Sequence, residues 1–204
     1  MSLFITFEGG EGSGKSTQAY RLYRRLNQLA IPALLTHEPG VTAIGKKVTR
    51  WLKWHHELAI SPLTELLLFN VSRAQLVTEV IRPALESGQI VICDRFADSS
   101  VAYQGYGRGI NIDVVKKTNE IATSGLQPDL SFLLDMPVEK AFLRKQDKQD
   151  RFEMEDPEFH RRVRQGFLSM AESEPERWCV IDGTLEKEEI ANSIWEKVRS
   201  LLIK

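Results

Sequence analysis

Short, continuous apolar runs alternate along this chain with segments whose apolar residues recur every three or four positions. Parallel strands that are buried on both faces have the first pattern, and amphipathic helices have the second. The runs predict five strands, at residues 3–7, 33–36, 90–93, 130–134 and 179–181. Because helical segments separate them, we expect an α/β fold of three layers, with a five-stranded parallel sheet between two layers of helices.

The helical spacing is clearest after the first strand and at the end of the chain, where Ile190, Ile194 and Val198 share one face. A long apolar helix should begin at Pro62, and Pro83 should loosen its last turns because proline lacks a backbone N–H. With 204 residues and no linker-like stretch, the chain is expected to form one domain, 1–204. Charged residues crowd at about 144–156, which predicts either a solvated turn or a small lid.

The composition is that of an ordinary globular protein, with 42% hydrophobic and 27% charged residues. The formal net charge of −1 gives no reason to expect a nucleic-acid or membrane partner. The two cysteines, Cys93 and Cys179, lie in apolar runs and are expected to be buried thiols in a reducing compartment. The apolar N-terminus lacks the basic start of a signal peptide, so we expect a cytoplasmic protein.

A glycine-rich segment between the first predicted strand and helix matches the P-loop pattern G-x-x-x-x-G-K-S, with Gly9, Gly10, Glu11, Gly12, Ser13, Gly14, Lys15 and Ser16. The glycines let backbone N–H groups and the helix N-terminus face phosphate oxygens. We expect these residues and Thr17 to bind the phosphates of a nucleotide, with Lys15 at the β- and γ-phosphates and Ser16 as a ligand of Mg²⁺.

Three charged residues near this loop allow more than one interpretation. A carboxylate beside phosphates is repelled, so Glu11 either faces solvent or accepts a hydrogen bond from a sugar hydroxyl of a second substrate. Asp94 and Arg95 follow a buried strand and should emerge at the same edge of the sheet. Asp94 can then hold Mg²⁺ and Arg95 can bind phosphate oxygens, or the two can form a structural salt bridge.

These segments and several others resemble the bacterial thymidylate kinases nearly from end to end. The resemblance is carried by residues 7–18, Glu38-Pro39-Gly40, residues 68–73, Asp94-Arg95-Phe96, residues 102–109 and Asp150-Arg151-Phe152-Glu153. It implies a P-loop nucleoside-monophosphate kinase that transfers the γ-phosphoryl group of ATP to dTMP with Mg²⁺, and that forms a homodimer through its helices.

The resemblance also implies roles for single residues. Phe69 would stack on thymine, and Arg73 would donate to a base carbonyl. Ser100 and Gln104 would contact the pyrimidine edge, and Tyr103 would favour deoxyribose. The remaining acceptor contacts would come from Glu11 to the 3′-hydroxyl, from Glu38 and Pro39 beside the thymine, and from Arg95 to the phosphate. From the residues alone, Phe69 and Tyr103 would be interpreted as packing residues.

The chain departs from the family pattern at two positions. His37 and Thr49 stand where the family commonly has arginine, and in the family the second of these contacts the acceptor phosphate. Arg50 could replace it through a shift of one residue, although neighbouring positions on a helix point about 100° apart.

Phosphoryl transfer to an anionic acceptor requires alignment and cations, and it needs no strong base. The P-loop carries no arginine, so Arg144 and Arg151 of the charged stretch are the candidates to neutralise the moving group. Arg151 is favoured of the two, because it lies in the family-like segment Asp150-Arg151-Phe152-Glu153. Two alternative functions stay open: another small P-loop kinase, and a nucleotide-binding homologue of weak or no activity. A GTPase switch is disfavoured because the chain has no Asn-Lys-x-Asp motif.

Overall fold

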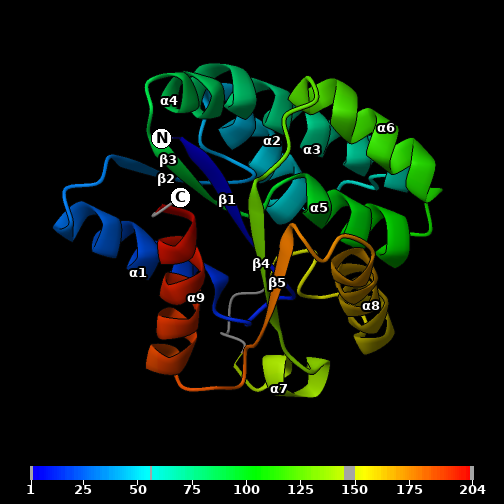
Figure 1. Cartoon of the computed structure of the whole chain (residues 1–204). Helices are drawn as coiled ribbons and strands as arrows, with labels where there is room; N and C mark the ends of the chain where they lie inside the picture. Colours follow the sequence, from blue (N-terminus) through cyan, green and yellow to red (C-terminus); the bar gives the residue numbers. More distant parts are fainter. Residues whose placement is uncertain (1, 56, 145–149, 203–204) are drawn as a thin grey trace.

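Five parallel strands form the centre of the computed structural model, in the order β2-β3-β1-β4-β5 (Figure 1). The structure describes residues 2–55, 57–144 and 150–202. The strands are β1 (Leu3–Glu8), β2 (Ala33–His37), β3 (Ile90–Asp94), β4 (Leu130–Asp135) and β5 (Trp178–Asp182). Each lies within two residues of its predicted bounds, so the prediction of a five-stranded parallel sheet is confirmed.

The strand β1 lies at the centre of the sheet, and all of its residues are buried. It pairs with β3, where Leu3 is opposite Ile90, and with β4, where Ile5 is opposite Leu130. Because all strands run in one direction, their carboxyl ends meet at a single edge of the sheet. The loops that follow β1, β2 and β3 therefore lie close together, and they carry the candidate site residues.

Two helices cover one face of the sheet, α1 (Lys15–Gln28) and α9 (Lys187–Leu202) (Figure 1). Leu22 and Leu26 of α1 pack with Ile194 and Val198 of α9 against the apolar side chains of the central strands. Burial of these side chains removes a large apolar area from water, which is the main favourable contribution to folding. This layer fixes the N-terminus of α1 at the edge of the sheet.

The other helices lie on the opposite side of the sheet or at its edge (Figure 1). They are α2 (Ala43–Trp54), α3 (Pro62–Leu76), α4 (Arg82–Glu86), α5 (Ala97–Ser100), α6 (Ile112–Thr123), α7 (Val138–Phe142) and α8 (Pro157–Ser173). Two π-helical segments, η1 (Val77–Ile81) and η2 (Val101–Gly107), interrupt them. A second core joins Leu52 of α2, Leu66 of α3, Tyr103 of η2 and Phe167 of α8.

The expected loosening before Pro83 is confirmed. The helix α3 begins at Pro62 and passes into the wider η1, after which α4 begins with Pro83 in its first turn. A proline cannot donate to the i−4 carbonyl, and a π-helical turn is one way in which a helix accommodates such a break.

Candidate active site

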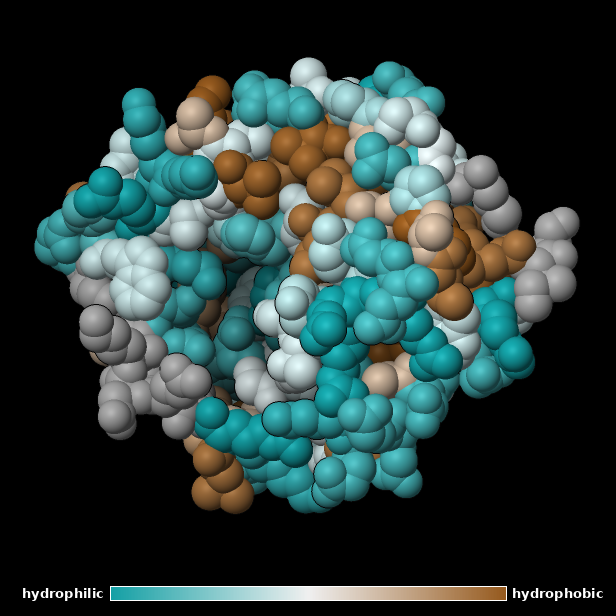
Figure 2. Space-filling view, turned by 90° about the vertical axis from the view of Figure 1, so that its left-hand side faces the viewer, coloured by the Kyte–Doolittle hydropathy of each residue, from teal (hydrophilic) through white to brown (hydrophobic). Residues whose placement is uncertain are grey.

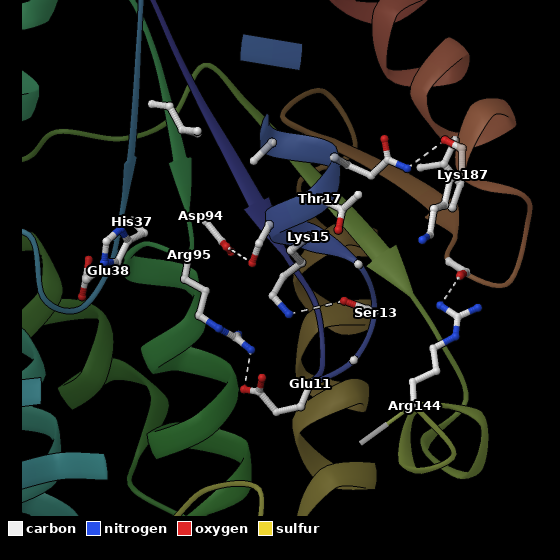
Figure 3. Close-up of a pocket in the computed structure, with 18 of the residues that line it drawn as sticks. Glu11, Ser13, Lys15, Thr17, His37, Glu38, Asp94, Arg95, Arg144 and Lys187 are labelled. Carbon is white, nitrogen blue, oxygen red and sulfur yellow. Dashed lines mark hydrogen bonds and ion pairs between the residues drawn. The ribbon is translucent and has the colours of Figure 1, made fainter. Parts of the chain in front are cut away.

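A pocket of about 1190 Å³ opens at the carboxyl edge of the sheet. Residues from the P-loop, from β2 and its following loop, from the end of β3 and from the loop before α9 line it. Figure 3 shows Lys15 near the middle, with His37 and Glu38 on one side and Arg144 and Lys187 on the other. The space-filling view shows a hollow that is bordered mostly by hydrophilic residues (Figure 2), as suits a site for charged groups.

The P-loop residues lie as their sequence pattern predicts. Gly9 has φ 138°, and a Cβ atom there would lie 2.6 Å from the carbonyl oxygen of Leu134, so only glycine fits. Gly14 precedes α1 as its N-cap with φ 94°, and it leaves the free N–H groups of the first helical turn facing the pocket. The loop therefore has the geometry of an anion site.

The ammonium group of Lys15 is held inside this loop. It donates to the carbonyl oxygen of Gly10 at 2.6 Å, and the side chain is almost fully buried. Burial, together with the like charge of Arg95, lowers the pKa of Lys15 to about 8, although Glu11 and Asp94 oppose the shift. A phosphate group placed here would favour the charged form of the lysine.

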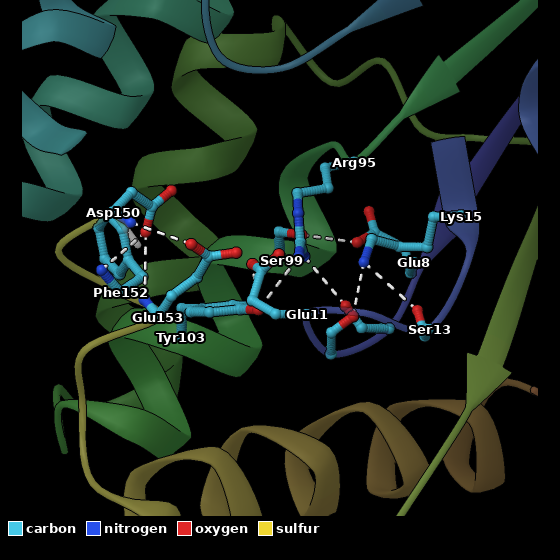
Figure 4. Close-up of polar contacts among 12 residues, drawn as sticks. Glu8, Glu11, Ser13, Lys15, Arg95, Ser99, Tyr103, Asp150, Phe152 and Glu153 are labelled. Carbon is cyan, nitrogen blue, oxygen red and sulfur yellow. Dashed lines mark hydrogen bonds and ion pairs between the residues drawn. The ribbon is translucent and has the colours of Figure 1, made fainter. Parts of the chain in front are cut away.

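Arg95 and Glu11 form an ion pair beside the P-loop (Figure 4). Arg95 Nη2 lies 2.5 Å from Glu11 Oε1, and the Tyr103 hydroxyl donates to the same oxygen at 3.0 Å. Burial by itself would raise the pKa of Glu11, but the charges of Arg95, Lys15 and Lys53 lower it to about 2. Glu11 is therefore ionised and faces the pocket.

Arg95 has φ 67°, in the left-handed region that residues with a side chain seldom adopt. Its backbone N–H donates to Phe7 O, and Arg95 Nη1 donates to Gly9 O at 3.1 Å and Ser99 Oγ at 3.2 Å. Backbone strain of this kind persists where the surroundings over-determine it, and it clusters at functional sites.

Glu8 is a functional neighbour that the sequence reasoning missed. Its carboxylate accepts from the Phe96 N–H at 2.7 Å and from Ser99 Oγ at 2.6 Å, so it braces the loop that carries Arg95. Burial and the nearby charge of Asp98 raise the pKa of Glu8 to about 8. A carboxylate at the end of a fully buried strand was the signal available in the sequence, since such a group needs partners.

A smaller, narrow pocket of about 40 Å³ adjoins the P-loop pocket and is lined by the residues expected to bind a base. Phe69, Arg73, Ser100, Tyr103 and Gln104 all line it, and Phe152 packs on Phe69 with ring centroids 5.6 Å apart. The prediction from sequence alone that Phe69 and Tyr103 are packing residues describes only part of their surroundings, since both also face this space.

Arg73 is completely buried and fixed by several partners. Arg73 Nη2 lies 2.6 Å from Glu38 Oε1 and donates to Ser100 Oγ at 2.8 Å, while Nη1 donates to Asn119 Oδ1 at 2.6 Å. Burial raises the pKa of Glu38, against the opposing charge of Arg73. The Glu38–Pro39 peptide bond is cis, and both residues line the two pockets.

Ser16 and Asp94 meet at the wall of the large pocket. The Ser16 hydroxyl donates to Asp94 Oδ2, and both residues line the pocket. Hydroxyl and carboxylate oxygens are the hard donors that Mg²⁺ prefers, so this pair fits the metal. Within the described residues, no group of three or more His, Cys, Asp or Glu side chains could hold a metal ion by itself.

The structure separates the two arginines of the expected lid. Arg144 lines the large pocket and donates to Gly183 O at 3.5 Å. Arg151 lines neither pocket, because Arg151 Nη2 lies 2.6 Å from Glu65 Oε2, a fully buried carboxylate that also binds Arg108 and Gln104. The part of the lid between them, 145–149, lies outside the described residues.

The side chain that could replace the arginine missing at Thr49 is not the one that the sequence suggested. Thr49 lines the large pocket, but Arg50 is exposed and lines neither pocket, because one helical step turns it away from Thr49. Lys53, one turn after Thr49, lines both pockets and lies 2.9 Å from Asp150 Oδ2. The i, i+4 spacing from Thr49 was the signal for Lys53 that the sequence reasoning missed.

The parallel sheet, the P-loop before α1 and the pocket at the carboxyl edge together define a P-loop kinase. The sequence model of the family described as "Thymidylate kinase" matches residues 7–194. The thymidylate kinase of Dehalococcoides mccartyi (strain CBDB1) is 55% identical over 203 residues, which cover 99% of this chain and 98% of the relative. That of Halothermothrix orenii is 49% identical and covers 99% of both chains.

Structural similarity agrees with these matches. The crystal structure of thymidylate kinase from Ehrlichia chaffeensis superimposes with a TM-score of 0.75 at 37% identity, covering 88% of this chain and 92% of that one. The chain belongs to the thymidylate kinase family, whose members are ATP-dependent dTMP kinases. No helix in the described part of the chain is long and apolar enough to cross a membrane.

Proposed function

We propose that this chain transfers the γ-phosphoryl group of ATP to the phosphate of dTMP, giving dTDP and ADP. The observation that best supports the proposal is the continuity of the two pockets. The P-loop lines the large pocket, the expected base-binding residues line the narrow one, and Glu11 and Arg95 line both. Two adjoining pockets of this kind support neighbouring sites for the phosphates of ATP and for the base of dTMP.

On the donor side, residues 9–17 would bind the phosphates of ATP through backbone N–H groups, and Lys15 would contact the β- and γ-phosphates. The free N–H groups of the first turn of α1 support this assignment. Ser16 and Asp94 would hold Mg²⁺, which when bound neutralises charge on the phosphates.

On the acceptor side, thymine would stack on Phe69, with Arg73, Ser100 and Gln104 along its polar edge and Pro39 beside it. Glu38 would keep Arg73 in place, as the buried ion pair between them suggests. Glu11 would accept a hydrogen bond from the 3′-hydroxyl, and Tyr103 would crowd the 2′ position. Arg95 would bind the acceptor phosphate from the junction of the two pockets.

The chemistry then follows from alignment and charge. The attacking oxygen of dTMP is already anionic, so no side chain has to remove a proton from it. One P–O bond forms to that oxygen and the bond to the ADP leaving oxygen breaks, while Lys15 and Arg95 neutralise charge on either side of the moving group. Arg144 supplies a further cation at the wall of the pocket.

Between the two lid arginines, the placement of the side chains favours Arg144, whereas the sequence had favoured Arg151. It lines the donor pocket, whereas Arg151 would have to leave a buried carboxylate in order to reach a phosphate. Arg151 could instead fasten the described part of the lid to α3, which would help to exclude water from the acceptor side.

We also propose a domain organisation, an oligomeric state and a cellular location for the protein. Residues 1–204 would form a single kinase domain with a lid at about 144–156. The chain would form a homodimer, for which Leu63, Leu67 and Val71 provide an exposed apolar stripe with four-residue spacing along α3. It would work in the cytoplasm, where unpaired thiols such as Cys93 and Cys179 stay reduced.

The test is a coupled assay of ADP release with dTMP, dUMP, dGMP and AMP as acceptors. dTMP should give the highest kcat/KM, and dUMP should be poorer by roughly 10- to 200-fold because it lacks the methyl group. If dGMP or AMP is the best acceptor, the base assignment is wrong. ATP binding without any transfer would mean that the chain is an inactive homologue.

A further inference from the structure

The two pockets meet at a junction whose walls are shared. Five residues line both of them: Glu11, Glu38, Pro39, Lys53 and Arg95. Within the described residues, Lys53 and Arg95 are thus the two cations that face both the P-loop pocket and the base pocket. Arg73 faces only the narrow pocket and Lys15 only the large one.

An acceptor nucleotide whose base lies in the narrow pocket must cross this junction with its phosphate. On the proposed assignment, Phe69 and Arg73 hold the base at one end of the two pockets, and Lys15 holds the phosphates of ATP at the other. The acceptor phosphate therefore lies between them, where it carries close to two negative charges at neutral pH. Cations at the junction can offset this charge, so that the phosphates of ATP, the second anion, can approach it.

Arg95 alone has few hydrogen-bond donors left for that phosphate. Its Nη1 group donates to Gly9 O and Ser99 Oγ, and its Nη2 group donates to Glu11 and the Tyr103 hydroxyl. Four of the five N–H donors of a guanidinium are thereby used. Its charge is also balanced by Glu11, so a second cation is needed at this place.

Lys53 has the position and the spare donors. Among the described residues its ammonium contacts one carboxylate, Asp150 Oδ2 at 2.9 Å, and an ammonium carries three N–H donors. The side chain is 31% exposed, so a ligand can reach it. Its charge also helps to lower the pKa of Glu11, which indicates that it acts on the same space.

The contacts around Lys53 hold it towards the junction. The Arg151 N–H donates to the carbonyl oxygen of Lys53 at 3.2 Å, so the end of α2 is joined to the turn that contains Asp150. Asp150 is fixed in that turn, since its Oδ1 atom accepts from the N–H groups of Phe152 and Glu153 (Figure 4). A preorganised cation loses less conformational entropy when it binds a ligand.

From this arrangement we propose that Lys53 binds the phosphate of the acceptor nucleotide together with Arg95, and that Asp150 positions it. The inference rests on the proposed dTMP kinase activity and adds a phosphate contact to it. Thr49 carries no charge, and Arg50 points away from the site. Lys53 lies one helical turn after Thr49 on the same face of α2, and it supplies a positive charge there.

The experiment compares the binding of dTMP and of thymidine, which has the same base and sugar but no phosphate. Calorimetry would be performed on the wild type, Lys53→Met, Lys53→Arg and Lys47→Met. The last variant is the control, because Lys47 is an exposed lysine of α2 that lines neither pocket.

Lys53→Met should weaken the binding of dTMP roughly 10- to 100-fold, with little change in the binding of thymidine or ATP. Lys53→Arg should recover part of the loss, and Lys47→Met should resemble the wild type.

Asp150→Asn separates phosphate binding from a structural role. If Lys53 only fastened the turn, Lys53→Met and Asp150→Asn would weaken dTMP and thymidine equally, and the proposal would be overturned. A loss in Arg50→Met instead of Lys53→Met would assign the contact to Arg50. The activity of the wild type tests the proposed function separately from the role of Lys53. If the wild type does not phosphorylate dTMP, the proposed function itself fails.

Discussion

Arg95 Nη2 lies 2.5 Å from Glu11 Oε1, although 84 residues separate the two in sequence. The P-loop contributes the carboxylate, and the strained turn after β3 contributes the guanidinium. Burial and the charge of Glu11 act in opposite directions on the pKa of Arg95, and the net effect raises it. Each group thus keeps the other ionised at the junction of the two pockets.

Replacing Glu11 with Gln should therefore weaken the binding of dTMP more than the binding of ATP. The amide keeps the size of the side chain and loses the charge that holds Arg95. On the proposed assignment, the same carboxylate accepts a hydrogen bond from the 3′-hydroxyl of dTMP. A hydrogen bond to a charged group contributes about 1.5–3 kcal/mol, so the KM for dTMP should rise by roughly tenfold or more. Steady-state kinetics measures this, with the exposed Glu86→Gln as control. An unchanged KM for dTMP would remove Glu11 from the acceptor site.

The pKa of Lys15 makes ATP binding depend on pH in a defined direction. Below pH 8 the lysine is charged before ATP arrives, so binding needs no proton. Above pH 8 the free enzyme has lost that proton, and the complex must take one up. The affinity for ATP should then fall by up to about tenfold per pH unit above 8. Calorimetry in two buffers of different ionisation enthalpy detects the uptake, and Lys15→Met should abolish it.

Glu8 should make the stability of the protein depend on pH. Its pKa is about 8 in the folded protein, against 4.5 as the ordinary value. Between those values the folded state binds more protons than the unfolded chain, so stability falls as pH rises. The slope is at most about 1.4 kcal/mol per pH unit for one group. Denaturant unfolding of Glu8→Gln, which resembles the protonated acid, should show a smaller decrease between pH 5 and 8. Equal slopes would show that Glu8 does not titrate in this range.

The parts of the structure that depend on local pattern could be predicted from the sequence. The five strands follow from apolar runs, and the P-loop follows from the spacing of Gly9, Gly14 and Lys15. The partners of buried charges could not be predicted, because they come from distant parts of the chain. Arg151 and Glu65 are 86 residues apart, and nothing in the pattern around either residue pairs them. Lys53 was missed because its neighbour Arg50 offered a simpler substitution for Thr49.

The two lid arginines should respond differently when each is replaced with alanine. Arg144 faces the large pocket, and a cation that neutralises the transferred group can contribute about 10³-fold in rate. Arg144→Ala should therefore lower kcat by roughly 10²-fold or more, with a modest change in ATP affinity and little change in stability. Arg151→Ala should instead lower the free energy of unfolding by about 1–3 kcal/mol, because Glu65 is buried and loses a charged partner.

Rapid-quench kinetics and denaturant unfolding of both variants provide the measurements, with Arg24→Ala as an exposed control on α1. Glu65→Gln should lower stability at least as much as Arg151→Ala, because it removes the ion pairs of Glu65 with both Arg151 and Arg108. If Arg151→Ala lowers kcat as much as Arg144→Ala and leaves stability unchanged, Arg151 leaves Glu65 during the reaction and acts on the phosphates. If neither variant lowers kcat, the charge that stabilises the transition state must come from Lys15, Arg95 and the metal.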